Sequence, residues 1–316
     1  MKNNRQVATI TFNPAIDQAV SVPNFTQNSV NRVESIHSHV GGKGINVASN
    51  LARCGHKVLA TGFLGLENKR AFMYHFANLG IADAFEKVEG SSRTNIKIID
   101  PGNKEITDLN FPGFTVREND HSAVINRLDA LADGTPDWLC LCGSLPPGLF
   151  EGAYADLIKW AKNNNCKTVL DTSGAPFNLA LACKPHVVKP NIHELEDALK
   201  RPLTSLPDVR DAARELVTQG IGLAAVSMGE EGSVFCSEHG CVHAVGKPLS
   251  LASTVGAGDA MVSGILHAQL QGYSLARTAT TATAFSLACL AELGPYLPEI
   301  SAIDGLEQTV TLTDLS

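Results

Sequence analysis

The sequence lacks the features that mark several large classes of protein. It has no block of lysine or arginine residues, and its net charge is −7. Both observations argue against binding to nucleic acid or to an anionic membrane. No apolar run is as long as a membrane span, and the first residues, MKNNRQVATITF, contain no long apolar stretch. We therefore expect a cytoplasmic enzyme or binding protein.

The eight cysteines form no C-x-x-C pair and show no zinc-ligand spacing. They are scattered through apolar segments, which is typical of reduced cysteines in a hydrophobic core. No cluster of histidine and cysteine indicates a transition-metal site. Cys142, although it precedes a glycine-rich turn, is given no catalytic role.

No linker, low-complexity segment or repeat divides the 316 residues. With 44% hydrophobic and 18% charged residues, the composition is that of a globular protein with a sizeable core. We expect one domain, residues 1–316.

Short β-rich runs alternate with longer amphipathic runs, which predicts an α/β fold with a mostly parallel sheet and helices on both faces. Strands are expected at residues 7–12, 58–63, 138–142, 168–171, 186–188 and 223–228. Helices are expected at residues 45–54, 69–79, 121–131, 154–162 and 208–218. Residues 15–40 and 92–114 interrupt this rhythm, and a turn at 100–103 separates two short strands. We interpret them as a small β-sheet lid.

The stretch STVGAGDAMVSGIL (residues 253–266) places glycines directly before a helical pattern. A helix N-terminus offers free N–H groups and the positive end of the helix dipole, and glycine lets an anion approach closely. Asp259 is unexpected at an anion site unless it takes part in chemistry beside the anion. The alternative is a plain helix N-cap, and the residue type alone does not decide between the two.

A second glycine cluster, GGKGINVA (residues 41–48), also begins a helix. It could be a flexible helix entry, or a phosphate or polyol site built from glycine amides, the Lys43 charge and Asn46. Neither cluster has the Walker pattern or G-x-G-x-x-G, so neither a P-loop nor a dinucleotide-binding fold is supported. Polar loops at residues 13–17, 189–194 and 227–232 follow predicted strands. Each alone could be ordinary turn chemistry, but the carboxyl ends of parallel strands share one edge, where ligands bind.

Taken together, these motifs resemble the ribokinase-type (PfkB) carbohydrate kinases. The order N-P-A-x-D, G-G-K-G-I-N-V-A, G-S-L-P-P-G (residues 143–148), K-P-N-x-x-E and T-V-G-A-G-D is similar over essentially the whole chain. Within the family, residues 9–15, 42–46 and 107–113 are most similar to the bacterial kinases that act on fructose 1-phosphate. The resemblance implies a Rossmann-like, ribokinase-like sheet with a β lid, the cofactors ATP and Mg²⁺, and a homodimer formed through the lid.

The resemblance also implies a role for each matching residue. Asp259 would be the catalytic base, with the amides of Gly256, Ala257 and Gly258 stabilising the transferred phosphoryl group. Asn191 and Glu194 would organise Mg²⁺ through water; a simpler role for Glu194 is compensation of a helix dipole. The residues expected to hold the nucleotide are Lys189, Asn191, Ser227, Gly229, Gly232, Thr254 and Val255, with residues 284–286 nearby.

For the sugar phosphate, the resemblance implies that Asp17, Gly42 and Asn46 bind hydroxyls. Lys43 and Arg93 would bind the phosphate, Arg93 through its two-pronged guanidinium. The simpler alternatives are a solvated Lys43 and a lid-surface Arg93. The histidines His37, His39 and His193 are interpreted as polar surface.

The expected reaction is ATP-dependent phosphorylation of fructose 1-phosphate to fructose 1,6-bisphosphate. A kinase of tagatose 6-phosphate is the nearest alternative, and a catalytically silent sugar-phosphate sensor is an alternative of a different class. A ribose or nucleoside kinase fits less well, because Lys43 and Arg93 suit a phosphorylated substrate.

Overall fold

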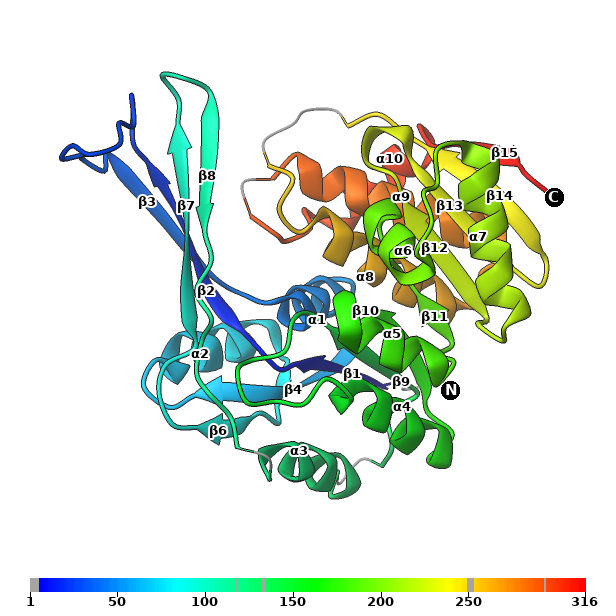
Figure 1. Cartoon of the computed structure of the whole chain (residues 1–316), viewed down its shortest axis with the longest axis horizontal. Helices are drawn as coiled ribbons and strands as arrows, with labels where there is room; N and C mark the ends of the chain where they lie inside the picture. Colours follow the sequence, from blue (N-terminus) through cyan, green and yellow to red (C-terminus); the bar gives the residue numbers. More distant parts are fainter. Residues whose placement is uncertain (1–5, 118, 132–133, 249–252, 293) are drawn as a thin grey trace.

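The computed structural model describes residues 6–117, 119–131, 134–248, 253–292 and 294–316. It consists of a large sheet covered by helices and a separate, smaller sheet that projects from one side (Figure 1). Among the described residues, none of the helices is long and apolar enough to cross a membrane.

The large sheet has 11 strands in the order β15-β14-β13-β12-β11-β10-β9-β1-β4-β5, with β6 paired to β4. Its strands are β1 (Gln6–Thr11), β4 (Lys57–Gly65), β5 (Ala82–Asp83), β6 (Glu86–Val88), β9 (Trp138–Cys142), β10 (Lys167–Asp171), β11 (Val187–Val188), β12 (Leu223–Ser227), β13 (Ser233–Ser237), β14 (Gly240–Val245) and β15 (Thr311–Asp314). The pairs from β4 through β12 are parallel, and β13 to β15 add antiparallel strands. The predicted mostly parallel sheet is therefore confirmed, with all six expected strands in it.

Helices cover both faces of this sheet, as expected. One hydrophobic core packs α3 (Asp120–Asp129), α4 (Ala153–Asn163) and α7 (Leu206–Thr218) against one face. A second core packs α1 (Lys43–Arg53), α2 (Lys69–Leu79), α8 (Ala257–Gln271) and α9 (Leu275–Leu290) against the other. The remaining helices are α5 (Gly174–Ala182), α6 (Ile192–Leu199) and α10 (Ile300–Glu307), with a 3₁₀ turn, η1 (Gly229–Glu231).

The smaller sheet has the strand order β3-β2-β7-β8 and is called the lid below. Its strands are β2 (Ala15–Ser21), β3 (Ser35–Gly41), β7 (Arg93–Asp100) and β8 (Glu105–Leu109). They fall almost entirely within the two segments predicted to form it. The predicted turn is present, because the Asp100 carboxylate accepts hydrogen bonds from the backbone N–H groups of Gly102 and Asn103 at 2.9 and 3.2 Å.

The expectation that the cysteines are reduced is wrong for one pair. Cys236 and Cys241 are joined by a disulfide between β13 and β14. The two residues are direct partners in the antiparallel register, with 4.2 Å between their Cα atoms. Strand register, which spacing alone does not reveal, brings them together. The other six cysteines are free thiols, and four of them, including Cys142, are buried.

Candidate active site

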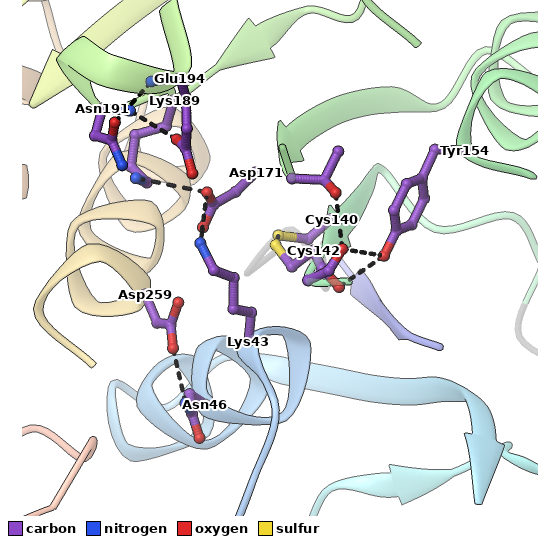
Figure 2. Close-up of polar contacts among 12 residues, drawn as sticks. Lys43, Asn46, Cys140, Cys142, Tyr154, Asp171, Lys189, Asn191, Glu194 and Asp259 are labelled. Carbon is purple, nitrogen blue, oxygen red and sulfur yellow. Dashed lines mark hydrogen bonds and ion pairs between the residues drawn. The ribbon is translucent and has the colours of Figure 1, made fainter. Parts of the chain in front are cut away.

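Two glycine-rich helix starts face each other at the carboxyl edge of the large sheet. Helix α1 begins after Gly42 and carries Lys43 and Asn46, and α8 begins after Gly256 and carries Asp259. The Asn46 side-chain amide donates a hydrogen bond of 2.7 Å to Oδ2 of Asp259. Figure 2 shows these side chains pointing toward one another from the two helices. Segments more than two hundred residues apart thus meet in one buried site.

The glycines of the α8 start serve different needs. Gly256 has a φ of 83°, in the left-handed region, and a Cβ there would lie 2.5 Å from the Cα of Pro295. A Cβ on Gly258 would meet only the ammonium of Lys189, at 3.5 Å. Gly256 is therefore required by the turn and its packing, whereas Gly258 leaves open space beside a cation, where an anion can approach the amides.

A buried carboxylate, Asp171, lies at the centre of the site's charges. It is fully buried and receives the Lys43 ammonium at 3.0 and 3.1 Å, while the Lys189 ammonium lies 3.6 Å away (Figure 2). Burial alone raises the pKa of Asp171, but Lys189 and Lys43 outweigh it and hold the pKa below its usual value. Lys43 is likewise kept charged, because the carboxylates of Asp171 and Asp259 raise its pKa more than burial lowers it.

Asp259 has the opposite balance. Its pKa is raised to about 6, mainly by burial. The charge of Lys43 and the hydrogen bond from Asn46 lower this pKa, whereas the charge of Asp171 raises it further. A carboxylate that titrates near neutrality and has no strong ion pair of its own can accept a proton from a nearby hydroxyl. The chemistry that Asp259 can perform is therefore general-base catalysis.

Asn191 and Glu194 form the N-terminus of α6 beside Lys189. Oδ1 of Asn191 accepts the backbone N–H of Glu194 at 2.9 Å, and the Glu194 carboxylate accepts the backbone N–H of Asn191 at 2.8 Å. This reciprocal capping box means that one carboxylate oxygen of Glu194 serves the helix. The helix role that the sequence left open for Glu194 is thus present, and its second oxygen has no hydrogen-bond partner among the contacts described.

A hollow of about 200 Å³ lies next to these charges. It is lined by Thr11, Asn13, Lys43, Arg93, Cys142, Gly143, Ser144, Thr172, Ser173 and Glu194. Among the lining side chains, Oγ1 of Thr11, Oδ1 of Asn13 and Nε of Arg93 are buried without a hydrogen-bond partner. Because buried polar atoms are normally paired, these orphaned atoms indicate a polar ligand.

The lid closes one side of the site. Asp17, on β2, accepts a hydrogen bond of 2.8 Å from Asn95 on β7. A Cβ on Gly41, at the end of β3, would lie 2.2 Å from a carboxylate oxygen of Asp17, so this carboxylate lies against the entry to α1. Arg93 donates to the backbone carbonyls of Asn13 and Phe111 at 3.3 and 3.4 Å. It is therefore held across the base of the lid and is not a free surface charge.

The structure brings most of the predicted site residues to this edge. Lys43, Asn46, Lys189, Asn191, Glu194 and Asp259 are clustered in Figure 2. The nucleotide candidates lie around the same edge: Ser227 is bridged to Asn191, Gly229 begins η1 and Gly232 follows it, and Thr254 and Val255 precede α8. Among the contacts described, none joins Gly229, Gly232, Thr254 or Val255 to the charged cluster.

The side chain of His193 is 86% exposed, as expected of polar surface, but His39 is half-buried in the lid.

Several residues of the site were not identified from the sequence. Asp171 was treated only as the last residue of a strand, and Thr11, Asn13 and Ser144 as strand or loop residues. A signal was present, since each lies at or just beyond the carboxyl end of a parallel strand. That position applies to many residues, however, and only the fold shows which side chains turn into the hollow.

A buried base between two helix starts, with cations on one side and a β lid on the other, is the arrangement expected of a sugar kinase. The chain belongs to the pfkB family of carbohydrate kinases, whose model matches residues 10–301.

Individual relatives make the likeness more specific. The 1-phosphofructokinase of Rhodobacter capsulatus is 48% identical over 310 residues, which cover 98% of each chain. Among solved structures, phosphofructokinase-2 from Escherichia coli in complex with fructose-6-phosphate aligns with a TM-score of 0.88 and 26% identity, covering 96% of this chain and 98% of that chain. A tetrameric inhibited form of the same enzyme aligns with a TM-score of 0.87 and 26% identity, with the same coverage.

Proposed function

We propose that this chain transfers the γ-phosphoryl group of ATP to fructose 1-phosphate, giving fructose 1,6-bisphosphate and ADP. The 1-phosphofructokinase relative supports the substrate, because its similarity spans the whole chain. The observation that carries the chemistry is the position of Asp259, a buried carboxylate at an open helix N-terminus that interacts with Lys43 in the wall of the polar hollow.

In this reaction the acceptor hydroxyl attacks the γ-phosphorus of ATP. The bond between the γ-phosphorus and the oxygen that leaves with ADP breaks, and the hydroxyl proton passes to Asp259. The amides of Gly256, Ala257 and Gly258 stabilise the charge that develops on the phosphoryl oxygens. Asp17, Gly42 and Asn46 hold sugar hydroxyls, and Lys43 and Arg93 bind the substrate phosphate groups. Asp171 supports this binding, because it fixes the Lys43 ammonium at the wall of the hollow.

The nucleotide would lie along the same sheet edge, against Lys189, Ser227, Gly229, Gly232, Thr254 and Val255. Lys189 and Gly258 border one space, which suits the phosphate chain of the nucleotide.

Magnesium would neutralise phosphate charge there, and Asn191 and Glu194 would be the residues of the protein that hold it. This fits the site, because one Glu194 carboxylate oxygen caps α6 and the other has no hydrogen-bond partner among the contacts described; Mg²⁺ commonly takes one carboxylate together with water and phosphates. Mn²⁺ binding followed by EPR with ATP present should weaken in Glu194→Gln.

We also propose that the chain, residues 1–316, works as one domain and pairs with a second copy through the lid. The outer strand β8 is exposed along its whole length, and Ile106, Leu109 and, on β3, Ile36 present apolar side chains to solvent. Light scattering should show a dimer in the wild type and a monomer in Ile106→Glu/Leu109→Glu. A wild-type monomer, or an oligomer that Ile106→Glu/Leu109→Glu leaves unchanged, would overturn this pairing.

The substrate is tested by ADP release with Mg²⁺-ATP and a panel of fructose 1-phosphate, tagatose 6-phosphate, fructose 6-phosphate, fructose and ribose. We expect the highest kcat/KM with fructose 1-phosphate. A preference for tagatose 6-phosphate would keep the mechanism and replace the substrate. Binding of a sugar phosphate with no turnover of any compound would make the chain a sensor and contradict the proposal.

A further inference from the structure

Three polar side chains form a row across the lid. In the register of the sheet, His39 on β3 lies directly opposite Asp17 on β2, and Asp17 lies directly opposite Asn95 on β7. Directly opposed residues project from the same face of a sheet. Asp17 lies against Gly41 at the entry to α1, so the row borders the site, with the side chains of His39 and Asp17 only 21% and 28% exposed.

The two neighbours hold Asp17 unequally. Asn95 donates to Oδ1 of Asp17 at 2.8 Å, and its own oxygen accepts the backbone N–H of Phe111 at 3.1 Å, so its orientation is determined on both sides. Nε2 of His39 lies 3.9 Å from Oδ2 of Asp17, beyond hydrogen-bond distance. That nitrogen is buried and has no hydrogen-bond partner. A buried unpaired nitrogen is costly, and a movement of about 1 Å would pair it with Asp17.

We propose that His39 and Asn95 are positioning residues that hold the Asp17 carboxylate from both sides, and that the His39 hydrogen bond to Oδ2 forms when sugar phosphate binds. This inference rests on the proposed role of Asp17 in binding a sugar hydroxyl. Asn95 sets the direction of the carboxylate in the free protein, and His39 completes its fixation in the complex. Their effect is on sugar affinity and not on nucleotide affinity.

The surroundings of His39 link the lid strand to the body. The Tyr296 ring meets the His39 ring edge-on, with 6.0 Å between centroids, and the Tyr296 hydroxyl donates to the backbone carbonyl of Val40. Behind Tyr296, the His75 ring stacks on it at 5.3 Å and the Arg53 guanidinium lies 5.5 Å from its centroid. The His39 ring is therefore supported from behind, so a small shift of β3 against this support can bring its nitrogen to Asp17.

The charge state of His39 follows from these neighbours. Burial lowers its pKa, and the Asp17 carboxylate only partly opposes that effect. The pKa of His75 is lowered to about 4, first by burial and then by the charges of Arg53 and His39. The pKa of Tyr296 is raised by burial and by Asp17, so its hydroxyl stays neutral. His39 is thus neutral at neutral pH. At acid pH its imidazolium would form an ion pair that neutralises the Asp17 carboxylate, which would then accept a hydrogen bond from a sugar hydroxyl more weakly.

The test compares His39→Phe and His39→Gln with a matched control, His37→Phe, which alters an exposed residue two positions earlier on β3. We expect His39→Phe to raise KM for the sugar phosphate about tenfold, the loss typical of one hydrogen bond to a charged group, with KM for ATP unchanged. His39→Gln should keep a sugar KM near the wild-type value, because its amide can still donate to Asp17. The control should match the wild type in both constants.

The acid range separates positioning from simple support of the lid. In the wild type, the sugar KM should rise more steeply on acidification than in His39→Gln, which has no imidazolium to form. Should His39→Phe fail to fold, this pH comparison decides alone. Equal pH profiles, or equal rises of both KM values in His39→Phe, would overturn the inference. If the wild type acts on another sugar phosphate, the same ratios are measured with that compound, so failure of the proposed substrate is told apart from failure of this inference.

Discussion

The two glycine-rich helix starts look alike in sequence but are built for different purposes. At the start of α1, Gly44 is packed against β1, where a Cβ would lie 2.4 Å from Oγ1 of Thr11 and 2.5 Å from the carbonyl oxygen of Ile10. At the start of α8, Gly258 has only the Lys189 ammonium near its missing side chain, at 3.5 Å. Gly44 is therefore required by the protein's own packing, whereas Gly258 leaves room for a group that approaches from outside.

The charges of the two starts differ in the same way. Lys43, on α1, is held in an ion pair by the buried Asp171. Asp259, on α8, has an amide as its hydrogen-bond partner and a pKa raised to about 6 by burial. A residue fixed in an ion pair is suited to binding, whereas a carboxylate near its pKa is suited to moving a proton. This difference supports the proposed roles, with binding at α1 and chemistry at α8.

The largest effect is expected from removing the base. Asp259→Asn keeps the hydrogen-bonding shape but cannot accept a proton, so turnover should fall by about 10²–10⁴-fold, with the affinities for ATP and sugar phosphate retained. Isothermal titration and single-turnover assays measure the two separately. Near wild-type turnover would remove Asp259 from the mechanism. Because folding raises the pKa of Asp259, stability is lost as the pH rises from the pKa of the unfolded chain to about 6, and the variant should be more stable at pH 7.5 by roughly 3 kcal/mol.

The next largest effect concerns the ion pair of α1. Asp171→Asn leaves the buried Lys189 and the partly exposed Lys43 without their shared counter-charge, which should lower the free energy of unfolding by about 3 kcal/mol, the lower end of the range for a broken buried pair. Urea denaturation measures this loss. Lys159→Gln, which breaks an exposed pair with Asp156, is the control and should change stability by less than about 0.5 kcal/mol. Equal effects of the two variants would contradict the central place given to Asp171.

Alanine at the two glycines tests the comparison directly. Gly44→Ala should lower the free energy of unfolding by about 1–3 kcal/mol, because the new methyl group overlaps β1. Gly258→Ala has room and should leave stability unchanged or slightly higher, while KM for ATP rises and kcat falls. Thermal unfolding and steady-state kinetics on both variants give the result. Loss of stability at Gly258, or an ATP defect with full stability at Gly44, would reverse the assignment.

The smallest effect is expected at Arg93, the arginine at the base of the lid that we propose binds the substrate phosphate. Arg93→Lys keeps the charge but loses the fork that spans two acceptors, so KM for the sugar phosphate should rise about tenfold. KM for ATP serves as the internal control. An unchanged sugar KM would return Arg93 to a purely structural role between Asn13 and Phe111.

Much of the fold could be predicted because the central strands and amphipathic helices follow clear periodicities. Helix α2 begins and ends at the predicted residues, and β9 does so as well. The antiparallel strands β13 to β15 were missed, since they break the strand–helix alternation on which the prediction depends. Helix α9 was also missed, because its sequence, LARTATTATAFSLACL, is buried on most sides and lacks a polar face.

The site was predictable where glycine, lysine and aspartate occur in ordered motifs. Asp171 could not be singled out, because a carboxylate at a strand end looks like any turn residue until Lys43 and Lys189 converge on it. His39 was interpreted as surface for a related reason: only the strand register places it opposite Asp17. Contacts between distant segments are decided by packing, which local patterns do not encode.

The measurement that tests the account most directly is the pH dependence of kcat with both substrates saturating. A base with a pKa of about 6 predicts that kcat is level above pH 7 and falls to about a tenth at pH 5. Lys43→Gln should move this fall to higher pH, because the Lys43 charge lowers the pKa of Asp259. A kcat that stays level to pH 5 in folded protein, or a fall that Lys43→Gln leaves in place, would contradict Asp259 as the base.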